Sequence, residues 1–382
     1  MISKKVDSLR ARWWRLTERR KTPWHRAALA DCLRQPPDLP VIAFPPGLGW
    51  QTQLFQRPQQ LALALARRGA LVFYLEPEHL PIPSGFRQEQ ERLYRCHVPI
   101  ETFHGLDRLW VYALTWNWKL VERFSPTRVI YDVVDHLNAF EGNPQTLRQV
   151  HERLARTAAL VLATSDDLHR QVRALRPDVQ LCPNGVDYEH FVRARKPSDA
   201  LHPADLAPIL AAGKPIIGYS GALAAWVDYE LVAQVASHCP DLSFVLIGPD
   251  HDRSLPASLL ALPNVYWLGV KPYAELPNYL RYFDVATIPF RLNEVTHATS
   301  PIKLFEYMTA GKPVVTTAMQ ECRGYPEVLI ARNESDFVVK LNDALRLRQD
   351  PVYLQALDRR ARQNTWDIRA DTILHAMVAG TG

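Results

Sequence analysis

Residues 300–315 read SPIKLFEYMTAGKPVV. The Ser-Pro pair favours the cap and first turn of a helix, and the glycine is typical of a helix end. Two valines follow the Gly-Lys-Pro turn, as in a buried strand. The stretch therefore predicts a helix over residues 302–310 and a strand over residues 313–317, which together form one unit of a parallel α/β sheet.

The first turn of that helix carries an unfavourable charge. Lys303 lies where a cation opposes the helix dipole, a conflict that a bound anion would remove. The N–H groups that follow Ser300 would face such an anion, and a diphosphate has the matching charge. Glu306 follows one turn later, where a carboxylate is placed to accept ribose hydroxyls. The simpler interpretation is a capped amphipathic helix with a surface Lys–Glu pair.

Strand and helix patterns alternate outward from this stretch along most of the chain. We expect strands at residues 41–45, 70–75, 109–114, 128–133, 159–163, 215–219, 242–247, 265–268, 285–289 and 313–317. Helices are expected at residues 55–68, 147–156, 166–175, 228–238, 275–282 and 302–310, and through the C-terminal part of the chain. Such alternation predicts an α/β fold with two Rossmann-like, doubly wound domains facing a cleft.

The rhythm of these patterns also predicts the domain boundaries. Residues 1–40 precede the first strand and form a basic extension, and residues 41–195 form the N-terminal, acceptor-side domain. Residues 196–214, rich in proline and alanine, lose the alternation and are expected to be a linker. Residues 215–360 form the nucleotide-sugar-binding domain. Residues 361–382 are expected to be a helix that packs back on the first domain.

A second motif, Asn-Gly-Val-Asp at residues 184–187, joins residues 300–315 in a pattern that resembles a known family. The chain is similar to nucleotide-sugar glycosyltransferases of the two-domain GT-B fold, close to family 4. It most resembles bacterial enzymes of cell-surface polysaccharide synthesis, including the teichuronic-acid-biosynthesis type. The resemblance implies a metal-independent hexosyltransferase that needs no cofactor and takes a nucleoside-diphosphate sugar as donor. It assigns the ribose to Glu306.

The sequence departs from the family 4 pattern in two places. The first glutamate of the usual E-x7-E pair is Ala298 here. The usual Gly-Arg-Leu with a following lysine appears as Gly-Ala-Leu at residues 221–223, with Val227 further on. Both changes remove groups that normally contact the donor. We expect Lys303, together with Arg291, to supply the missing positive charge.

Other donor-side candidates follow the strands of the second half. Ser220 and Gly221 end the first of these strands, where small residues allow the backbone to approach a phosphate closely. Gly248, Val270 and Lys271 follow the next two strands, in loops that flank the nucleotide base in the resembled enzymes. Plain strand-to-helix turns are the alternative at each position.

The first half offers a glycine loop on its acceptor side. Gly47, Gly49 and Trp50 lie between the first strand and the first helix, and Arg57 follows a few residues later. A glycine loop there suits a passing phosphate or acceptor, although an ordinary turn explains the same residues equally well.

Candidate catalytic groups cluster after the strand at residues 128–133. Asp135, then Asp132 and His136, are the side chains that we expect to take a proton from an acceptor hydroxyl. Strand-end capping and interdomain hydrogen bonding are the alternatives. The resemblance to family 4 favours retention of anomeric configuration, whereas an acidic base would suit inversion.

The amino-acid composition limits the classes of protein to which the chain can belong. The 382 residues are 47% hydrophobic and 22% charged, which is normal for a globular protein of about two domains. No run of about 18 apolar residues and no secretory signal are present, and the five scattered cysteines predict neither a disulfide framework nor a metal site. We therefore expect a cytoplasmic protein.

The charge is concentrated at the N-terminus. Residues 1–26 hold nine Lys and Arg against two acidic residues, a net +7, so the remaining chain carries −2 of the overall +5. A nearly neutral body argues against nucleic acid as a partner. Basic residues interleaved with Trp13, Trp14 and Trp24 suit an anionic membrane surface on the inner face of the plasma membrane. A solvated tail is the alternative.

The expected reaction is transfer of a sugar from a nucleoside diphosphate to a saccharide or lipid-linked acceptor. Two alternatives are a same-fold nucleotide-sugar epimerase or hydrolase, and a non-catalytic nucleotide-sugar-binding scaffold. The departures at residues 222 and 298 are the main support for a scaffold. Donor sugar, base and acceptor stay open.

Overall fold

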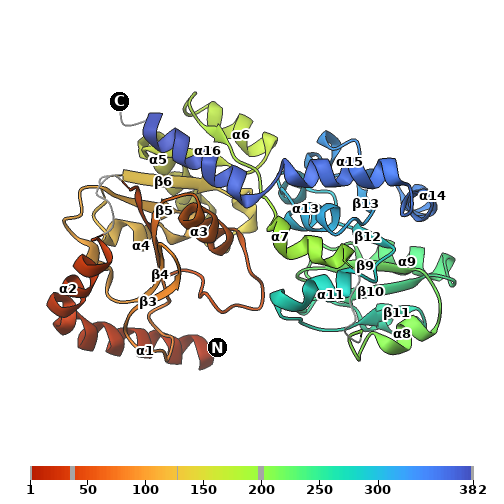
Figure 1. Cartoon of the computed structure of the whole chain (residues 1–382), viewed down its shortest axis with the longest axis horizontal. Coiled ribbons are helices and arrows are strands. Elements are labelled where there is room, and N and C mark those ends of the chain that lie inside the picture. The colour runs from red at the N-terminus through yellow and green to blue at the C-terminus, as the bar shows by residue number, and fades with distance from the viewer. Residues whose placement is uncertain (1, 35–38, 127, 197–201, 380–382) are drawn as a thin grey trace. The chain divides into compact units, whose positions relative to one another are not determined.

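The computed structural model describes residues 2–34, 39–126, 128–196 and 202–379. They form two compact units, residues 1–183 with 366–382 and residues 184–365 (Figure 1). Each unit is a parallel sheet with helices around it, so the predicted α/β class with two Rossmann-like domains is confirmed.

The sheet of the first unit has eight strands in the order β3-β4-β2-β1-β5-β6-β7-β8. All neighbours pair in parallel except β3 and β4, which form an antiparallel edge. The strands are β1 (Val41–Phe44), β2 (Leu71–Leu75), β3 (Gly85–Gln90), β4 (Leu93–His97), β5 (Leu109–Ala113), β6 (Arg128–Val133), β7 (Leu160–Ala163) and β8 (Gln180–Leu181). The four residues of β1 are all buried, which explains their uninterrupted apolar sequence.

Helices cover this sheet and include both ends of the chain. They are α1 (Ile2–Glu18), α2 (Thr22–Cys32), α3 (Arg57–Arg67), α4 (Trp118–Arg123), α5 (Pro144–Thr157), α6 (Asp166–Arg173) and α16 (Trp366–Ala379). Helix α16 packs along α3, although 300 residues separate Arg67 from its ion-pair partner Asp367 (Figure 1).

The sheet of the second unit has six strands, all parallel, in the order β11-β10-β9-β12-β13-β14. This is the 3-2-1-4-5-6 order of a Rossmann domain, in which ligands bind beyond the carboxyl ends of the strands. The strands are β9 (Ile216–Ser220), β10 (Ser243–Ile247), β11 (Val265–Trp267), β12 (Val285–Ile288), β13 (Val314–Thr317) and β14 (Leu329–Ala331).

Short and long helices alternate with these strands. They are α7 (Tyr188–Phe191), α8 (Ala207–Ala211), α9 (Tyr229–His238), α10 (Ala257–Leu260), α11 (Leu276–Leu280), α12 (Glu294–His297), α13 (Ile302–Thr309), α14 (Glu334–Leu347) and α15 (Pro351–Arg362). The expected helix over residues 302–310 is α13, and Gly311 ends it with a positive φ of 70° before β13.

The two units divide at residue 183, before the expected domain end at residue 195. Part of the expected linker, residues 197–201, lies outside the described residues, and α8 occupies another part of it. At the other end, α16 is counted with the first unit, whereas α15 belongs to the second.

The basic extension has more structure than a solvated tail. Helices α1 and α2 belong to the first unit, and Leu29 of α2 is 3% exposed. His25 of α2 is fully buried, with its Nε2 2.9 Å from Oε2 of Glu18 in α1. Within the described residues, no helix combines the length and apolar character needed to cross a bilayer.

Candidate active site

The start of α13 differs in detail from the expected cap. Pro301, and not Ser300, occupies the cap position, and no side chain caps this helix. Ser300 instead meets the Asn-Gly-Val-Asp motif: Nδ2 of Asn184 donates to its carbonyl oxygen at 2.6 Å, and N–H of Asn184 donates to its Oγ at 3.3 Å. The two motifs that carried the family resemblance are therefore joined by hydrogen bonds.

Lys303 lies against the turn that follows β9. A Cβ atom built on Gly221 would be 2.7 Å from Cε and 3.1 Å from Nζ of Lys303. Gly221 has a φ of 145°, which side-chain-bearing residues rarely adopt. The ammonium is also 5.3 Å from the ring centroid of Tyr219 and 4.9 Å from that of Phe290. The fold thus holds a cation over two rings and beside a glycine turn.

The same turn is held from two other sides. A Cβ on Gly248 would lie 1.9 Å from the carbonyl oxygen of Gly221, so the loop after β10 touches the turn backbone to backbone. The N–H of Ser220 donates to the hydroxyl of Tyr307 at 2.7 Å. Sequence reasoning missed Tyr307, although it follows Glu306 directly in residues 300–315.

Lys303 and Glu306 are both half-buried in α13. In the described part of the chain, no hydrogen bond or ion pair engages either side chain. Burial lowers the pKa of Lys303 and raises the pKa of Glu306, and each charge partly opposes the shift of the other. Burial therefore disfavours both charged forms, and a ligand with a phosphate and hydroxyls would favour both. The arrangement can bind a phosphorylated, hydroxyl-bearing molecule.

The remaining donor-side candidates have other surroundings. The Nζ of Lys271 pairs with Oδ2 of Asp205 at 2.6 Å, and its donor-binding role stays a prediction. Arg291 lines a surface cavity of about 470 Å³ whose lining does not include Lys303, so their joint action stays a prediction. Val270 is 40% exposed.

In the first unit, Asp132 and Arg57 form a buried ion pair, so both side chains have structural partners and their catalytic and acceptor-side roles stay predictions. The Arg57 side chain is 5% exposed, and its Nε donates to Oδ2 of Asp132 at 2.7 Å. Its other nitrogens donate to the carbonyl oxygens of Cys182 and Pro183, and the Tyr112 hydroxyl donates to Asp132. These hydrogen bonds connect α3, β5, β6 and residues 182–183 at the end of the first unit.

Asp135 differs from Asp132, whose carboxylate is bound by Arg57 and Tyr112. It follows β6 and is half-buried, and no hydrogen bond or ion pair of the described residues engages its carboxylate. Burial raises the pKa of Asp135 to about 7; the nearby Arg57 lowers it, and Asp132 raises it further. His136 lies next to it, and its Nδ1 accepts from the N–H of Asn138 at 3.3 Å, a capping contact.

In the glycine loop of the first unit, Gly47 and Trp50 are packed against other residues of the unit. Trp50 is 8% exposed, its backbone N–H donates to Oε2 of Glu76 at 2.9 Å, and its ring packs edge-on against Tyr74; its acceptor-side role stays a prediction. A Cβ on Gly47 would lie 2.3 Å from the ring of Trp116, which is 38% exposed. Gly49 meets only ordinary contacts. Sequence reasoning missed Trp116, because only the fold brings it to Gly47.

Metal ligands do not cluster in the described residues: no three His, Cys, Asp or Glu side chains are grouped as a metal site.

Comparison with known proteins agrees with this geometry. Residues 214–350 match the family described as glycosyl transferases group 1. A Bacillus subtilis (strain 168) protein, TuaH, named as a candidate teichuronic acid biosynthesis glycosyltransferase, is 29% identical over 266 residues. That match covers 64% of this chain and 65% of TuaH, just under two thirds of the relative.

Solved structures share the fold over nearly the whole chain. Sucrose-phosphate synthase from Thermosynechococcus elongatus has a TM-score of 0.63 at 16% identity, covering 90% of this chain and all of its own. Anabaena HepE in complex with UDP-glucose has a TM-score of 0.62 at 17% identity, covering 89% of this chain and 99% of its own. The neighbours are GT-B glycosyltransferases, so the expected GT-B fold and the resemblance to this group are confirmed.

Proposed function

We propose that the protein transfers a sugar from a nucleoside diphosphate to an acceptor hydroxyl. The match of residues 214–350 to the glycosyl transferases group 1 family and the GT-B fold of the chain support this proposal. One observation carries the proposal. Lys303 and Glu306, one turn apart in α13, are half-buried without a polar partner among the described residues, and Lys303 adjoins the glycine turn after β9. Their charges match a diphosphate and a ribose.

Each donor-side group has a distinct role in this proposal. The Lys303 ammonium pairs with the diphosphate, which approaches the backbone of Gly221 because no side chain intervenes there. The Glu306 carboxylate accepts the ribose hydroxyls. Structures of HepE with UDP and with UDP-glucose support a nucleoside-diphosphate sugar as the donor. Since Lys303 supplies positive charge to the leaving diphosphate, we propose that transfer is metal-independent.

Asp135 is the proposed general base on the acceptor side. Its carboxylate lacks a polar partner, and a pKa of about 7 suits a group that takes up and releases a proton near neutral pH. As the hydroxyl oxygen of the acceptor bonds to the anomeric carbon, its proton passes to Asp135, and the bond to the nucleoside diphosphate breaks. This role implies inversion at the anomeric carbon.

We further propose a saccharide or lipid-linked acceptor in cell-surface polysaccharide synthesis. The likeness to TuaH supports this class of acceptor. A lipid-linked acceptor is held in a membrane, so we propose that the protein works as a peripheral protein on the cytoplasmic face, held by its basic residues 1–26.

Donor turnover tests the proposal. The purified protein is incubated with radiolabelled UDP- or GDP-sugars, with and without lipid extract from bacterial membranes. We expect release of nucleoside diphosphate that depends on the extract, and label in the lipid fraction. Release without an acceptor would indicate a hydrolase, a changed sugar without release an epimerase, and donor binding with no turnover a scaffold. Each of these results contradicts sugar transfer.

A further inference from the structure

Helix α1 is attached to the first unit by one of its faces. Trp14 stacks on His97 of β4 with ring centroids 4.6 Å apart. Glu18, one turn further along the same face, is 6% exposed and contacts His25. The opposite face of α1 is consequently directed away from the body of the unit.

That outer face carries a ridge of large apolar side chains. Leu9, Trp13 and Leu16 are 66%, 70% and 64% exposed. Their spacing of four and three residues places them on one side of the helix. Single exposed apolar residues are ordinary, but three in a row on the solvent side of one helix mark an interaction surface.

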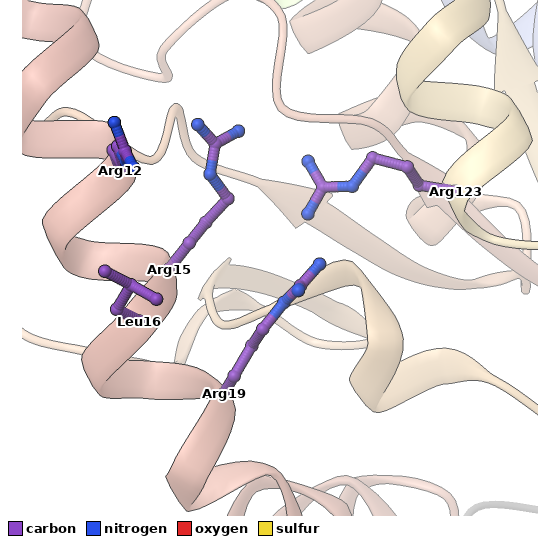
Figure 2. A pocket seen from close by; sticks show the side chains of 5 residues that line it. All are labelled: Arg12, Arg15, Leu16, Arg19 and Arg123. Carbon is purple, nitrogen blue, oxygen red and sulfur yellow. The ribbon is translucent and has the colours of Figure 1, made fainter.

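Arginines line a cavity beside this ridge. The cavity has a volume of about 340 Å³ and is lined by Arg12, Arg15 and Leu16 of α1, by Arg19 directly after α1, and by Arg123 of α4. Figure 2 shows the guanidinium groups of Arg15 and Arg123 pointing toward each other across it, with Arg19 reaching into the same space. The cavity therefore presents many N–H donors in a small volume.

Two carboxylates neutralise only part of this charge. Glu78 pairs with Arg15 at 3.0 Å and with Arg123 at 2.9 Å. Glu101 pairs with Arg19 at 2.7 Å and with Arg123 at 3.4 Å. Four arginines against two glutamates leave an excess of two positive charges at the cavity.

We propose that the outer face of α1, defined as Leu9, Arg12, Trp13, Leu16 and the adjacent arginine cavity, docks on the surface of an anionic bilayer. The apolar ridge enters the boundary between headgroups and acyl chains, where tryptophan is favoured. The arginines meet lipid phosphates, which they bind in bidentate fashion. Charge complementarity selects this occupant, since a neutral apolar partner would leave the excess positive charge of the cavity unmatched. The inference rests on the proposed membrane location, but not on sugar transfer.

Sedimentation of the full chain with vesicles tests the docking face. One vesicle set is phosphatidylcholine alone, and the other also contains phosphatidylglycerol. We expect binding to the anionic set that weakens as salt rises. Arg12→Glu and Trp13→Ser should each lower the partition coefficient on the order of tenfold, the first through charge and the second through apolar burial. Salt should affect the Arg12→Glu variant less than the parent protein.

Exposed positions in the second unit provide matched controls. Arg346→Glu changes the net charge as Arg12→Glu does, and Val352→Ser removes an apolar side chain that is 75% exposed. Both should leave vesicle binding within about twofold of the parent protein. All four positions are exposed, so circular dichroism melting and donor calorimetry should be unchanged, which separates this test from that of sugar transfer.

Three results would overturn the proposal. Equal vesicle binding by Arg12→Glu, Trp13→Ser and the controls would show that another surface carries the attachment. Equal binding to both vesicle sets would remove the role of charge. Binding of inorganic phosphate in calorimetry without any vesicle binding would make the cavity a site for a soluble anion.

Discussion

Gly221 lies so close to Lys303 that the absence of a side chain at this position is required for the contact. Substitution of Gly221 by alanine places a Cβ 2.7 Å from the lysine and forces a side chain onto a φ of 145°. We expect a loss of stability of about 1–3 kcal/mol from the backbone and at least tenfold weaker donor binding from the displaced ammonium. Chemical unfolding and calorimetry measure the two effects.

The matched control is Gly213→Ala. Gly213 also has a positive φ, of 65°, but an added Cβ meets nothing within 4 Å. It should therefore lose stability without losing donor affinity. If both variants bind the donor as the parent protein does, the turn after β9 does not touch the ligand.

Lys303→Ala and Glu306→Gln test the two proposed ligand contacts separately. A hydrogen bond to a charged group is worth about 1.5–3 kcal/mol, so each variant should bind the donor about tenfold to a hundredfold more weakly. Loss of Lys303 should affect UDP strongly and uridine little, whereas loss of Glu306 should affect both. Lys340→Ala, on the outside of α14, is the control. Unchanged affinities in both variants would refute the assignment.

The raised pKa of Asp135 predicts how kcat/KM changes with pH. A base with a pKa near 7 is half-protonated at neutral pH, so kcat/KM should rise as pH increases through about 7. Asp135→Asn should lower turnover by about 10²–10⁴-fold with donor affinity unchanged. A product of the parent protein in which the anomeric configuration is retained, as shown by NMR, would exclude the base role.

The Asp135 carboxyl also makes the free energy of unfolding depend on pH, and this free energy falls where kcat/KM is expected to rise. Its folded pKa is raised from 3.8 to about 7, so the unfolded chain binds fewer protons between these values. The contribution of Asp135 to the unfolding free energy is therefore fully present below about pH 4 and is lost as pH rises toward 7. The stability of Asp135→Asn relative to the parent protein should increase over that interval.

At the scale of elements, Arg57 and Asp132 connect the start of α3 with the end of β6. Asp132→Asn leaves a buried guanidinium without its counter-charge, so we expect a loss of about 3–5 kcal/mol in unfolding free energy. The double variant Arg57→Leu with Asp132→Leu should recover part of this loss, because no charge is left buried. A fully stable but inactive Asp132→Asn protein would instead restore the catalytic interpretation.

Elements with a strong local pattern were predictable from sequence. The helix over residues 302–310 and the strand after it have clear periodicity and a glycine stop signal, and both lie within a residue or two of the prediction, although the expected Ser300 cap is not formed. The β3–β4 hairpin was not predicted, because β3 is an edge strand whose residues are largely exposed and polar. The N-terminal helices were not predicted either, since their basic composition hides the buried Leu29 and His25.

Side-chain roles depended on partners distant in sequence. The side chain of Lys271 is paired with Asp205, and the backbone N–H of Trp50 donates to the carboxylate of Glu76. No spacing in the sequence indicates these contacts, so the sequence alone does not show how either residue is held. Lys303 was different, because its conflict with the helix dipole is visible in residues 300–315 alone.

At the scale of the molecule, the first unit is built from both ends of the chain. Trp366, Ala370, Ile373 and Met377 of α16 are at most 2% exposed, and α16 packs along α3. The unit therefore depends on a helix that is translated after the whole second unit, and the two units differ in this respect. The second unit, residues 184–365, is continuous in sequence.

This asymmetry predicts opposite results for two truncations. A chain ending at residue 365 loses three large buried side chains, worth about 5 kcal/mol or more, which is comparable to the whole stability of a domain. Its first unit should unfold, seen as loss of one transition in calorimetric melting and rapid proteolysis of residues 1–183. Residues 184–365 expressed alone should fold and bind the donor, because Lys303, Glu306 and Gly221 all lie within them. A chain shortened only by residues 380–382 is the control. If the chain ending at residue 365 melts as the control does, the packing of α16 contributes little, and the first unit is complete without it.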